Sequence, residues 1–376
     1  MIHVGLNLVW LTPGHHGGLE VYARELIARL AARPDLRLTA FVNRALGPWP
    51  DVPSELVPVT PARRVEWVRG EQQLLPRAAT RAGCDVVHSL ASTGPLRGPF
   101  RRVTTIHDLN YLKVPEAHFG VRGLGMRALV PAAAWRSHRI IADSASTRDD
   151  VVRHLRVRSD RVDVVPLGVG FSRAAEPRPA GELRAELALG DRAVVLSVSA
   201  KRPHKNLMRL LGALARIPAE RRPALVIPGY PTPYEAELRQ RAGALGLDGD
   251  LRMLDYVSPA DLEGLYALAD AFVFPSLYEG FGLPVLEAMT RGVPVACSDR
   301  SSLPEVAGDA ALIFDAEDEA AIAAAIERLL GDRAEAERLR GAGREQAARF
   351  TWERTAELTV ASYRRALEGR ARRMPE

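Results

Sequence analysis

Strand-like apolar runs alternate with helix-like segments along almost the whole chain, and this alternation limits the possible folds more than any other feature. In the first half, the runs expected to form strands cover residues 2–10, 36–43, 86–88, 103–106, 139–142 and 162–165. Between them, apolar residues recur at helical spacing, for example over 19–30. Parallel strands that are covered on both faces are apolar throughout. The pattern therefore predicts an α/β fold built on parallel sheets.

The same alternation begins again in the second half of the chain. Strands are expected at 193–198, 224–227, 252–254, 271–274, 293–296 and 311–314, and a long helix at 352–370. Residues 171–181 lack periodicity and are rich in Ala, Pro, Glu and Arg, which is typical of a linker. The length of 376 residues also exceeds the usual ~150 residues of one domain. We therefore predict two doubly wound domains, 1–170 and 182–350, facing each other across a cleft.

Composition favours a globular cytoplasmic protein, with 47% apolar and 26% charged residues. No run of ~18 apolar residues predicts a membrane-spanning helix. Residues 1–7 begin as a strand rather than as a secretion signal. Cys84 and Cys297 lie in apolar segments, which favours buried free thiols in a reducing compartment. The net charge is +5 with many arginines in the first half, so we also expect either peripheral contact with an anionic inner membrane face or ordinary solvated arginines.

Two glutamates stand eight residues apart around a glycine-containing loop. Glu279 follows the predicted strand 271–274, and Glu287 lies about two turns into the helix expected at 284–290. The intervening residues 280–283 expose backbone N–H groups at the helix start, where anions bind. Open α/β sheets bind ligands at the carboxyl ends of their strands. The segment offers donors for a phosphate and acceptors for sugar hydroxyls, as a nucleotide-sugar requires; the alternative is a solvated helix face.

Lysine is rare in this chain and is concentrated at one place. Only three lysines occur, and two of them, Lys201 and Lys205, fall just after the predicted strand 193–198. An ammonium group acts as a point charge toward phosphate, and a departing diphosphate needs preorganised positive groups. We expect Lys205 and the amides of residues 280–283 to supply this charge, with either Lys201 or Arg202 as a second positive group.

We expect no metal site and no other cofactor. The triplet Asp248-Gly249-Asp250 lies in a polar segment between a predicted helix and a predicted strand, which is typical of a surface turn. The pair His15-His16 has no Cys or carboxylate at ligand spacing, which favours a loop. A nucleotide-sugar would be a substrate rather than a cofactor.

His107 is the histidine that the sequence places best for a functional role. It ends the predicted strand 103–106 and is followed directly by Asp108. Ligands bind at the carboxyl ends of such strands. We expect His107 to hold a donor sugar or an acceptor rather than to act as a nucleophile; the alternative is a satisfied core histidine.

Taken together, these residues resemble the retaining glycosyltransferases of family 4, whose GT-B fold has two facing Rossmann-like domains. The resemblance covers essentially the whole chain. It is carried by Gly17-Gly18, Ile106-His107-Asp108, residues 143–147, Lys205-Asn206, residues 255–257, the segment from Glu279 to Glu287, and Trp352-Glu353. One departure is that Ser199-Ala200 stands where many relatives have Gly-Arg.

The resemblance implies roles for the matched positions. His107, Glu279 and Lys205 would be catalytic, and Glu287 would accept hydrogen bonds from the ribose. The other donor-binding positions would be Gly17, Gly18, Lys201, Arg202, Gly229, Tyr256, Gly280, Phe281, Gly282 and Leu283. The N-terminal domain would bind the acceptor through loops such as 67–81 and 109–127, and the C-terminal domain would bind the nucleotide-sugar. The last helix, about 355–376, would pack back on the N-terminal domain.

The implied function is transfer of a hexose-type sugar from a nucleotide-diphosphate sugar to a hydroxyl group, with retention and without a metal. The acceptor would be a sugar, a lipid-linked molecule or a small molecule, and no nucleic-acid partner is expected. A nucleotide-sugar 2-epimerase is an alternative of the same fold, although it would need further acid/base carboxylates in the cleft. A silent sugar-nucleotide-binding module is a third class, and the presence of His107, Lys205 and both motif glutamates argues against it.

Overall fold

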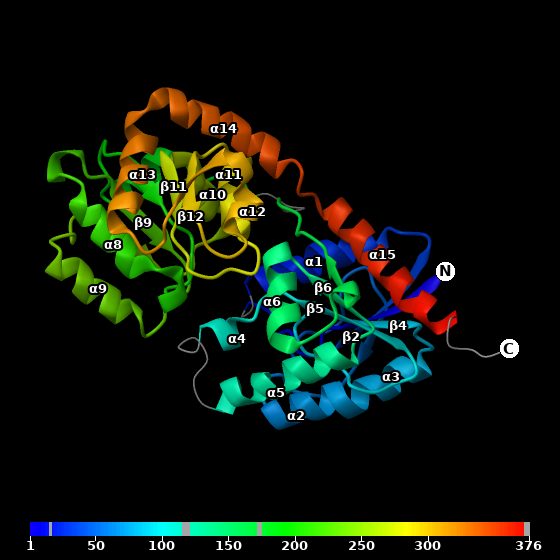
Figure 1. Cartoon of the computed structure of the whole chain (residues 1–376). Coiled ribbons are helices and arrows are strands. Elements are labelled where there is room, and N and C mark those ends of the chain that lie inside the picture. Colours follow the sequence, from blue (N-terminus) through cyan, green and yellow to red (C-terminus); the bar gives the residue numbers. More distant parts are fainter. Residues whose placement is uncertain (15–16, 115–120, 171–174, 372–376) are drawn as a thin grey trace. The chain divides into compact units, whose positions relative to one another are not determined.

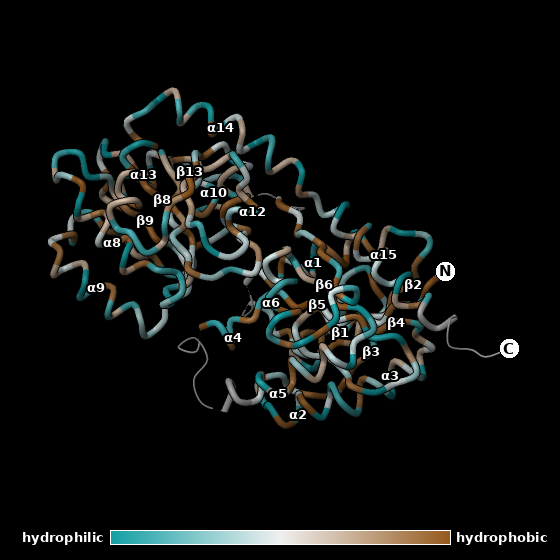
Figure 2. The backbone as a smooth tube through the Cα atoms, viewed as in Figure 1, coloured by the Kyte–Doolittle hydropathy of each residue, from teal (hydrophilic) through white to brown (hydrophobic). Residues whose placement is uncertain are grey.

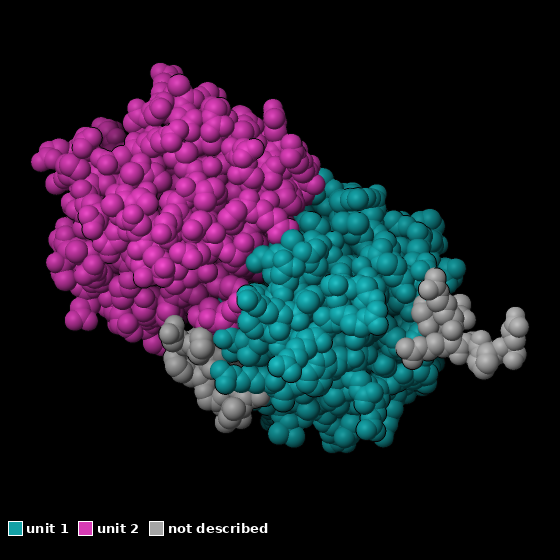
Figure 3. All heavy atoms as spheres, viewed as in Figure 1, with its two compact units in different colours: residues 1–112, 119–168, 351–376 teal, residues 113–118, 169–350 magenta. Residues whose placement is uncertain are grey.

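The computed structural model describes residues 1–14, 17–114, 121–170 and 175–371. The predictions for His15, His16, part of the linker and the end of the last helix lie outside these ranges. The chain divides into two compact units, which Figure 3 distinguishes by colour. Unit 1 comprises residues 1–112, 119–168 and 351–376, and unit 2 comprises residues 113–118 and 169–350.

Unit 1 contains a seven-stranded parallel sheet in the order β3-β2-β1-β4-β5-β6-β7. Its strands are β1 (Ile2–Asn7), β2 (Leu36–Val42), β3 (Ser54–Leu56), β4 (Val86–Ser89), β5 (Arg101–Ile106), β6 (Arg139–Ala142) and β7 (Val162–Val164). Its helices are α1 (Gly18–Ala31), α2 (Arg64–Arg69), α3 (Leu75–Arg81), α4 (Asn110–Lys113), α5 (Val121–Arg136), α6 (Ala145–Leu155) and α15 (Trp352–Ala371), with a π-helical turn at Gly70–Leu74 and a 3₁₀ turn at Ser159–Arg161.

The last helix, α15, packs against α1 and against β4, β5 and β6 (Figure 1). It therefore belongs to unit 1, although nearly all of unit 2 precedes it in the chain. Its side chains reach the sheet directly, because the Tyr363 hydroxyl lies 2.8 Å from Nδ1 of His88 in β4. Thr355 Oγ1 also donates to the carbonyl of Pro166, 2.8 Å away.

The segments 67–81 and 109–127, which we predicted as loops, contain much helix. Residues 64–81 form α2, the π-helical turn and α3 without a break. Leu75, Ala78 and Ala79 of α3 are buried in a core cluster with Phe41 and Val87 of the sheet. The helix was missed because its outward residues are arginines and polar groups, and these hide the apolar face. The second segment includes α4 and the start of α5.

Unit 2 contains a six-stranded parallel sheet in the order β10-β9-β8-β11-β12-β13. Its strands are β8 (Val194–Leu196), β9 (Ala224–Pro228), β10 (Leu251–Leu254), β11 (Ala271–Phe274), β12 (Val295–Ser298) and β13 (Ala311–Phe314). Its helices are α7 (Ala180–Glu186), α8 (Leu207–Arg216), α9 (Glu235–Ala244), α10 (Pro259–Leu268), α11 (Leu283–Thr290), α12 (Leu303–Ala307), α13 (Glu319–Gly331) and α14 (Arg333–Ala347), with 3₁₀ turns at Pro203–Lys205, Ala219–Arg221 and Gly308–Ala310.

Helices cover both faces of this second sheet. Buried residues of α8, α9 and α13 form one cluster with strand residues such as Val195, Ile227 and Val273. On the opposite face, Tyr266 of α10 packs against Phe272, with ring centroids 5.9 Å apart. Figure 2 shows hydrophobic residues, in brown, along the strands inside each unit and many hydrophilic residues, in teal, along the outer helices. Both sheets are thus doubly wound, as the alternation of segments predicts.

Two further sequence expectations concern cysteines and membrane helices. Cys84 and Cys297 are both free and buried, as predicted. Within the described residues, no helix combines the length and apolar character needed to cross a membrane.

Candidate active site

Lys205 and Glu279 meet at the carboxyl edge of the unit 2 sheet. Lys205 ends the turn that follows β8, and Glu279 follows β11, the strand paired with β8. Lys205 Nζ lies 2.6 Å from Glu279 Oε1. The ammonium group also lies 5.5 Å from the centroid of the Phe274 ring. Both side chains are mostly buried, at 17% and 13% exposure, so the pair is only weakly screened by water.

Asn206 keeps the turn that carries Lys205 close to the ends of two other strands. Its side-chain amide donates to the carbonyls of Pro275, 3.0 Å away, and Ala316, 2.7 Å away. These carbonyls follow β11 and β13. The Lys205-Asn206 pair therefore combines one charged group with one neighbour that fixes its position.

The glycine loop leads directly into α11. Gly282 is the N-cap of this helix, and no side chain caps its first turn. Hydroxyls from the loop after β12 hold the preceding carbonyls: Ser301 Oγ donates to Glu279 O at 2.5 Å, and Ser302 Oγ donates to Phe281 O at 2.7 Å. The Phe281 ring packs edge-on against Phe350, 5.7 Å away. These contacts fix the loop, and the positive end of the α11 dipole, which favours anions, lies at this loop.

Glu287 lies in α11 within a network of buried polar groups. The Tyr266 hydroxyl donates to Glu287 Oε2 at 3.0 Å. Arg291 stacks its guanidinium 4.5 Å from the centre of the Tyr266 ring and binds Glu263, with 2.7 Å between Nε and Oε2. Burial raises the pKa of Glu287, and Arg291 opposes that rise. One carboxylate oxygen is therefore oriented by Tyr266, which suits the group for directed hydrogen bonds with hydroxyls.

The structure corrects the prediction for Lys201. Its side chain is fully buried, and Nζ donates to the carbonyls of Gly229, 2.7 Å away, and Leu254. The ammonium group also lies 3.8 Å from Glu235 Oε2. Burial lowers the pKa of Lys201, and Glu235 opposes this effect. Lys201 therefore ties the loop after β8 to the ends of β9 and β10, and its charge points into the protein rather than toward a phosphate.

Gly229 also has a packing role. Its φ is +150°, and a Cβ atom there would lie 2.1 Å from the carbonyl oxygen of Ser199. Its carbonyl accepts from Lys201, and its N–H donates to Asp255 O at 3.2 Å. Only glycine fits this crossing of two loops. Gly229 is therefore required for the packing of these two loops, which is a backbone role.

Arg202, which follows Lys201 in the chain, and Tyr256, which follows Asp255, are both exposed. Tyr256 stacks on Tyr230, with ring centroids 5.1 Å apart and an angle of 28° between the planes. The two tyrosines follow β10 and β9, the strands on the far side of β8 from β11. Stacked aromatic rings offer a flat face that a planar base can cover.

In unit 1, His107 forms a pair with Asp143. His107 follows β5, and Asp143 follows the neighbouring strand β6. His107 Nδ1 lies 2.6 Å from Asp143 Oδ2, and Nε2 lies 2.9 Å from the carbonyl oxygen of Leu90. The Tyr22 ring packs edge-on against the imidazole at 4.7 Å. Burial favours a lower pKa for His107, but Asp143 and the Leu90 carbonyl outweigh it and raise the pKa.

His88, at the neighbouring strand end, has the opposite character. Its two ring nitrogens lie 2.8 Å from the hydroxyls of Tyr363 and Thr105. Hydroxyls can donate or accept, so this ring does not need to carry a charge. Burial lowers the pKa of His88 to about 3. His88 and His107 thus lie at the ends of neighbouring strands but differ in environment. Of these two, His107 is the one that pairs with a carboxylate in the described part of the chain.

Gly17 and Gly18 lie at the start of α1 in unit 1. Gly17 is the N-cap, with a φ of +47°, and makes no side-chain cap. A Cβ atom on either glycine would meet nothing within 4 Å among the described residues. Another group can therefore approach the backbone closely at this helix start.

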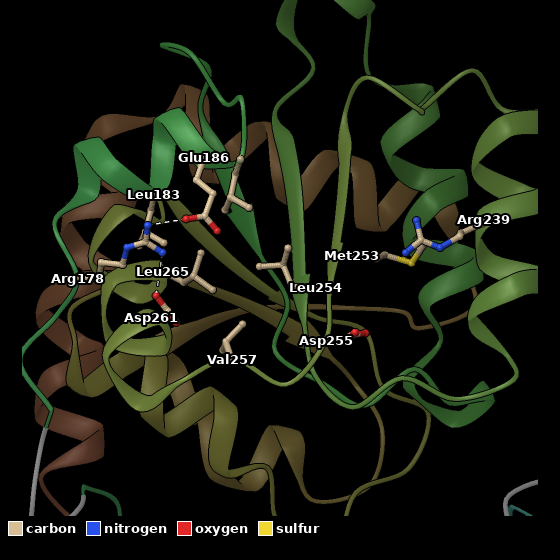
Figure 4. Close-up of a pocket in the computed structure, with 11 residues that line it drawn as sticks. Arg178, Leu183, Glu186, Arg239, Met253, Leu254, Asp255, Val257, Asp261 and Leu265 are labelled. Atoms are coloured by element: carbon tan, nitrogen blue, oxygen red, sulfur yellow. Dashed lines mark hydrogen bonds and ion pairs between the residues drawn. The ribbon is translucent and has the colours of Figure 1, made fainter.

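A cavity of ≈ 300 Å³ opens in unit 2 beside the edge strand β10 (Figure 4). Arg178 at one side is paired with Glu186 at 2.5 Å and with Asp261 at 3.2 Å. Leu183, Leu254 and Leu265 supply apolar lining. Asp255 and Val257, which flank Tyr256, also line this cavity, whereas Lys205, Glu279 and Glu287 do not. The cavity is thus distinct from the cluster around Lys205.

The Asp248-Gly249-Asp250 triplet forms part of a turn before β10. Asp250 binds Arg192 through Oδ1 at 2.8 Å and Arg222 through Oδ2 at 3.1 Å. Both carboxylate oxygens are therefore used in ion pairs. In the described part of the chain, no group of three or more His, Cys, Asp or Glu side chains is arranged to hold a metal ion.

Sequence reasoning missed two groups that orient the predicted residues. We placed Asp143 in the capping segment of a helix, but Ser144 is the N-cap of α6 and Asp143 binds His107. A usable signal was available, because Asp143 and His107 both directly follow strands. Tyr266 gave no such signal, since it lies within α10 and reaches Glu287 only through packing.

Two protein-family models match the chain. One, described as Glycosyltransferase Family 4, matches residues 16–173, and the other, Glycosyl transferases group 1, matches residues 180–346. The chain is 36% identical over 269 residues to O-antigen chain mannosyltransferase B of Escherichia coli, which covers 70% of each chain. It is 32% identical over 400 residues to a D-inositol 3-phosphate glycosyltransferase of Geodermatophilus obscurus, covering 94% of this chain and 86% of that one.

Solved structures show the same fold at low sequence identity. Sucrose-phosphate synthase from Thermosynechococcus elongatus superimposes with a TM-score of 0.79 and 22% identity, over 98% of this chain and 100% of that one. Anabaena HepE, solved in complex with UDP-glucose, has a TM-score of 0.74 and 18% identity, over 99% of this chain and 100% of that one. These likenesses confirm the GT-B class.

Proposed function

Because the chain belongs to glycosyltransferase family 4 and is a glycosyltransferase, we propose that it transfers a hexose from a nucleotide-diphosphate sugar to an acceptor hydroxyl with retention of configuration. The observation that carries this proposal is the grouping of Lys205, Glu279 and the start of α11 at one edge of the unit 2 sheet. The cation and the amides at the helix start suit the negative charge of a diphosphate, and the carboxylate suits the hydroxyls of a sugar.

Each part of the donor has a proposed partner in unit 2. The diphosphate binds Lys205 and the amides of residues 280–283, and Arg202 is the second positive group because Lys201 is buried. The ribose hydroxyls donate to Glu287, whose carboxylate is oriented by Tyr266. The base lies toward β9 and β10, where Tyr230 and Tyr256 stack. Glu279 contacts the sugar.

In the proposed reaction, the bond between the anomeric carbon and the diphosphate oxygen breaks, and the acceptor oxygen bonds to that carbon from the same face. The acceptor proton moves to an oxygen of the leaving diphosphate. The products are the glycoside and a nucleoside diphosphate. Lys205 and the helix amides stabilise the charge that develops on the diphosphate, which is where such groups accelerate a reaction.

Metal independence is part of the proposal. The positive charge comes from side chains and helix amides, and the Asp250 carboxylate is already bound by two arginines. The hexose is proposed to be mannose, because a relative that is 36% identical is a mannosyltransferase. The acceptor is a hydroxyl of a sugar, a lipid-linked molecule or a small molecule.

A panel of nucleotide-sugars tests the proposal. Mannose and glucose donors with guanine or uracil bases are added to the full chain, and a rise in the melting temperature identifies the bound donor. Acceptor-dependent release of nucleoside diphosphate, unchanged by EDTA, is then expected. Proton NMR of the first-formed product should show the donor's anomeric configuration. Conversion of the donor to its 2-epimer without an acceptor would instead indicate the epimerase, and an inverted product would overturn retention.

A further inference from the structure

Both ring nitrogens of His107 face groups that accept hydrogen bonds. The carbonyl oxygen of Leu90, 2.9 Å from Nε2, can only accept, so Nε2 carries a proton. Asp143 Oδ2 lies 2.6 Å from Nδ1, the short distance typical of a charge-assisted bond. A carboxylate there also can only accept, so Nδ1 carries a proton too. The geometry corresponds to an imidazolium ion held between two acceptors.

The surroundings of the pair favour this charge distribution. Asp143 directly precedes the N-cap of α6, and the positive end of a helix favours a carboxylate. Asp108 adds a second negative group beside His107. The Tyr22 ring from α1 lies 4.7 Å away, and His88 from β4 is held neutral by burial. Among the described residues, the titratable groups facing His107 thus supply negative charge and no competing cation.

Asp143 also shows that the pair is more than ordinary core packing. Its side chain is 2% exposed, and its second oxygen, Oδ1, has no hydrogen-bond partner among the described residues. A buried carboxylate oxygen without a partner is costly, and such groups concentrate at functional sites. The capping of α6 does not require Asp143, because Ser144 performs it. In the described part of the chain, the hydrogen bond to His107 is therefore the interaction that accounts for this carboxylate.

We propose that Asp143 is a positioning residue that holds His107 as a fixed cation, so that His107 cannot accept the proton of the acceptor hydroxyl. This inference rests on the function proposed above. The proton then leaves on the departing diphosphate, as in the balanced reaction. His107 contributes positive charge and a fixed ring orientation to unit 1.

The first test reads the ring directly and needs no ligand. The full chain is labelled with ¹⁵N-histidine, its nine histidines are resolved by long-range ¹H–¹⁵N spectra, and His107→Gln identifies the relevant signal. We expect both His107 nitrogens to be protonated at pH 7. In Asp143→Asn, the ring should titrate about 1–2 pH units lower, because the charged partner is lost. A neutral His107 ring at pH 7 in the wild type would overturn the proposal.

Asp150→Asn is the matched control. Asp150 also faces a histidine, with 3.5 Å between its Oδ1 and His154 Nε2, but this pair lies along α6. The control should leave the His107 signal unchanged. Circular dichroism establishes that each variant is folded. If Asp143→Asn does not fold, the wild-type ring state alone still decides the proposal.

A kinetic test uses the donor identified by the nucleotide-sugar panel. In Asp143→Asn, kcat/KM should approach the wild-type value at pH 6 and fall about tenfold per pH unit above the new ring pKa, because the cation is lost. A uniform loss at every pH would indicate a merely structural role and would overturn the proposal. If no donor is turned over, the proposed function fails. The ligand-free ring spectra would still decide whether Asp143 holds His107 as a cation.

Discussion

Lys205 and Glu279 form a close ion pair, with 2.6 Å between Nζ and Oε1, although they follow different strands of the unit 2 sheet. A different hydrogen bond positions each residue. Asn206 fixes the turn before α8, and Ser301 donates to the backbone carbonyl of Glu279. Within the pair, each charge satisfies the other. A diphosphate that binds Lys205 must therefore compete with Glu279, and this competition makes the pair testable.

Lys205→Ala should reduce turnover more than donor affinity. The leaving diphosphate gains charge in the transition state, so the loss should be about 2–4 kcal/mol of transition-state stabilisation. Steady-state kinetics with the donor from the panel measures it. Lys205→Arg should recover only part of the activity, because the guanidinium differs in shape and reach. Wild-type kcat/KM in the alanine variant would remove Lys205 from the reaction.

Glu279→Gln should tighten the binding of nucleoside diphosphate while lowering sugar transfer. The substitution removes a negative charge beside the proposed phosphate site and frees Lys205 from its partner. For a pair that is mostly buried, a gain on the order of 1 kcal/mol is expected at low salt. Isothermal titration calorimetry at two salt concentrations measures the change. Weaker binding of the diphosphate would show that Glu279 does not compete for Lys205.

Tyr266→Phe should weaken nucleotide binding although Tyr266 itself is buried. The change deletes the hydroxyl that orients Glu287 Oε2, and an unpaired buried carboxylate oxygen costs about 1–3 kcal/mol. Calorimetry with the nucleoside diphosphate measures the affinity, and Glu287→Ala should show at least as large a loss.

Tyr363→Phe is the matched control for this variant. It deletes another buried tyrosine hydroxyl, which lies 2.8 Å from His88 in unit 1. It should lower stability but leave nucleotide affinity unchanged. Equal loss of affinity in both tyrosine variants would mean that global destabilisation, rather than the orientation of Glu287, is responsible.

Lys201→Met should show that Lys201 has a structural role, distinct from the phosphate binding proposed for Arg202. Removing Nζ leaves the carbonyls of Gly229 and Leu254 without this donor, so the melting temperature should fall. The affinity for nucleoside diphosphate, measured below the melting transition, should change by no more than about twofold. Arg202→Ala should have the opposite profile, because Arg202 is exposed. Loss of diphosphate affinity only in Lys201→Met would restore Lys201 as the phosphate ligand.

The sequence predicts the strands best where an apolar run is continuous and bounded by polar or turn-forming residues. The bounds of β11 (Ala271–Phe274) and β13 (Ala311–Phe314) agree with the predicted ranges. The edge strand β3 was missed because its three residues, Ser54–Leu56, form no apolar run. Helix α14 was missed because only four of its fifteen residues are buried. Local pattern thus identifies strands that contain a continuous apolar run, including β13 at a sheet edge, whereas elements without such a run depend on tertiary packing.

The same distinction applies to the site. A position in the segment that follows a strand is a local property, and Lys205, Glu279 and His107 lie in such segments, as the sequence predicts. The direction of a side chain is not local. Lys201 shares the strand-end position, but its Nζ turns toward a carbonyl 53 residues further along the chain. The partner Asp143 lies 36 residues from His107, so the sequence suggests the pair only through neighbouring strands.

Glu71→Gln should change how stability depends on pH. Glu71 lies in the π-helical turn, is 1% exposed, and accepts hydrogen bonds from Asn7 at 3.1 Å and Thr93 at 3.0 Å. Burial raises its pKa to about 7 from the ordinary value of 4.5. The folded protein therefore keeps a proton that the unfolded chain has released between these two values. This contribution to stability is complete below pH 4.5 and is lost as pH rises through 7.

Urea unfolding at pH 5 and pH 8 measures the effect. The wild type should lose on the order of 3 kcal/mol more than Glu71→Gln between these conditions, because the glutamine has no proton to lose and its amide oxygen can still accept from Asn7. Glu66→Gln, in the adjoining α2, is the control and should follow the wild-type curve, since Glu66 is ion-paired to Arg63 near the surface. Parallel pH dependence in the wild type and Glu71→Gln would mean that Glu71 ionises in the folded protein as readily as in the unfolded chain.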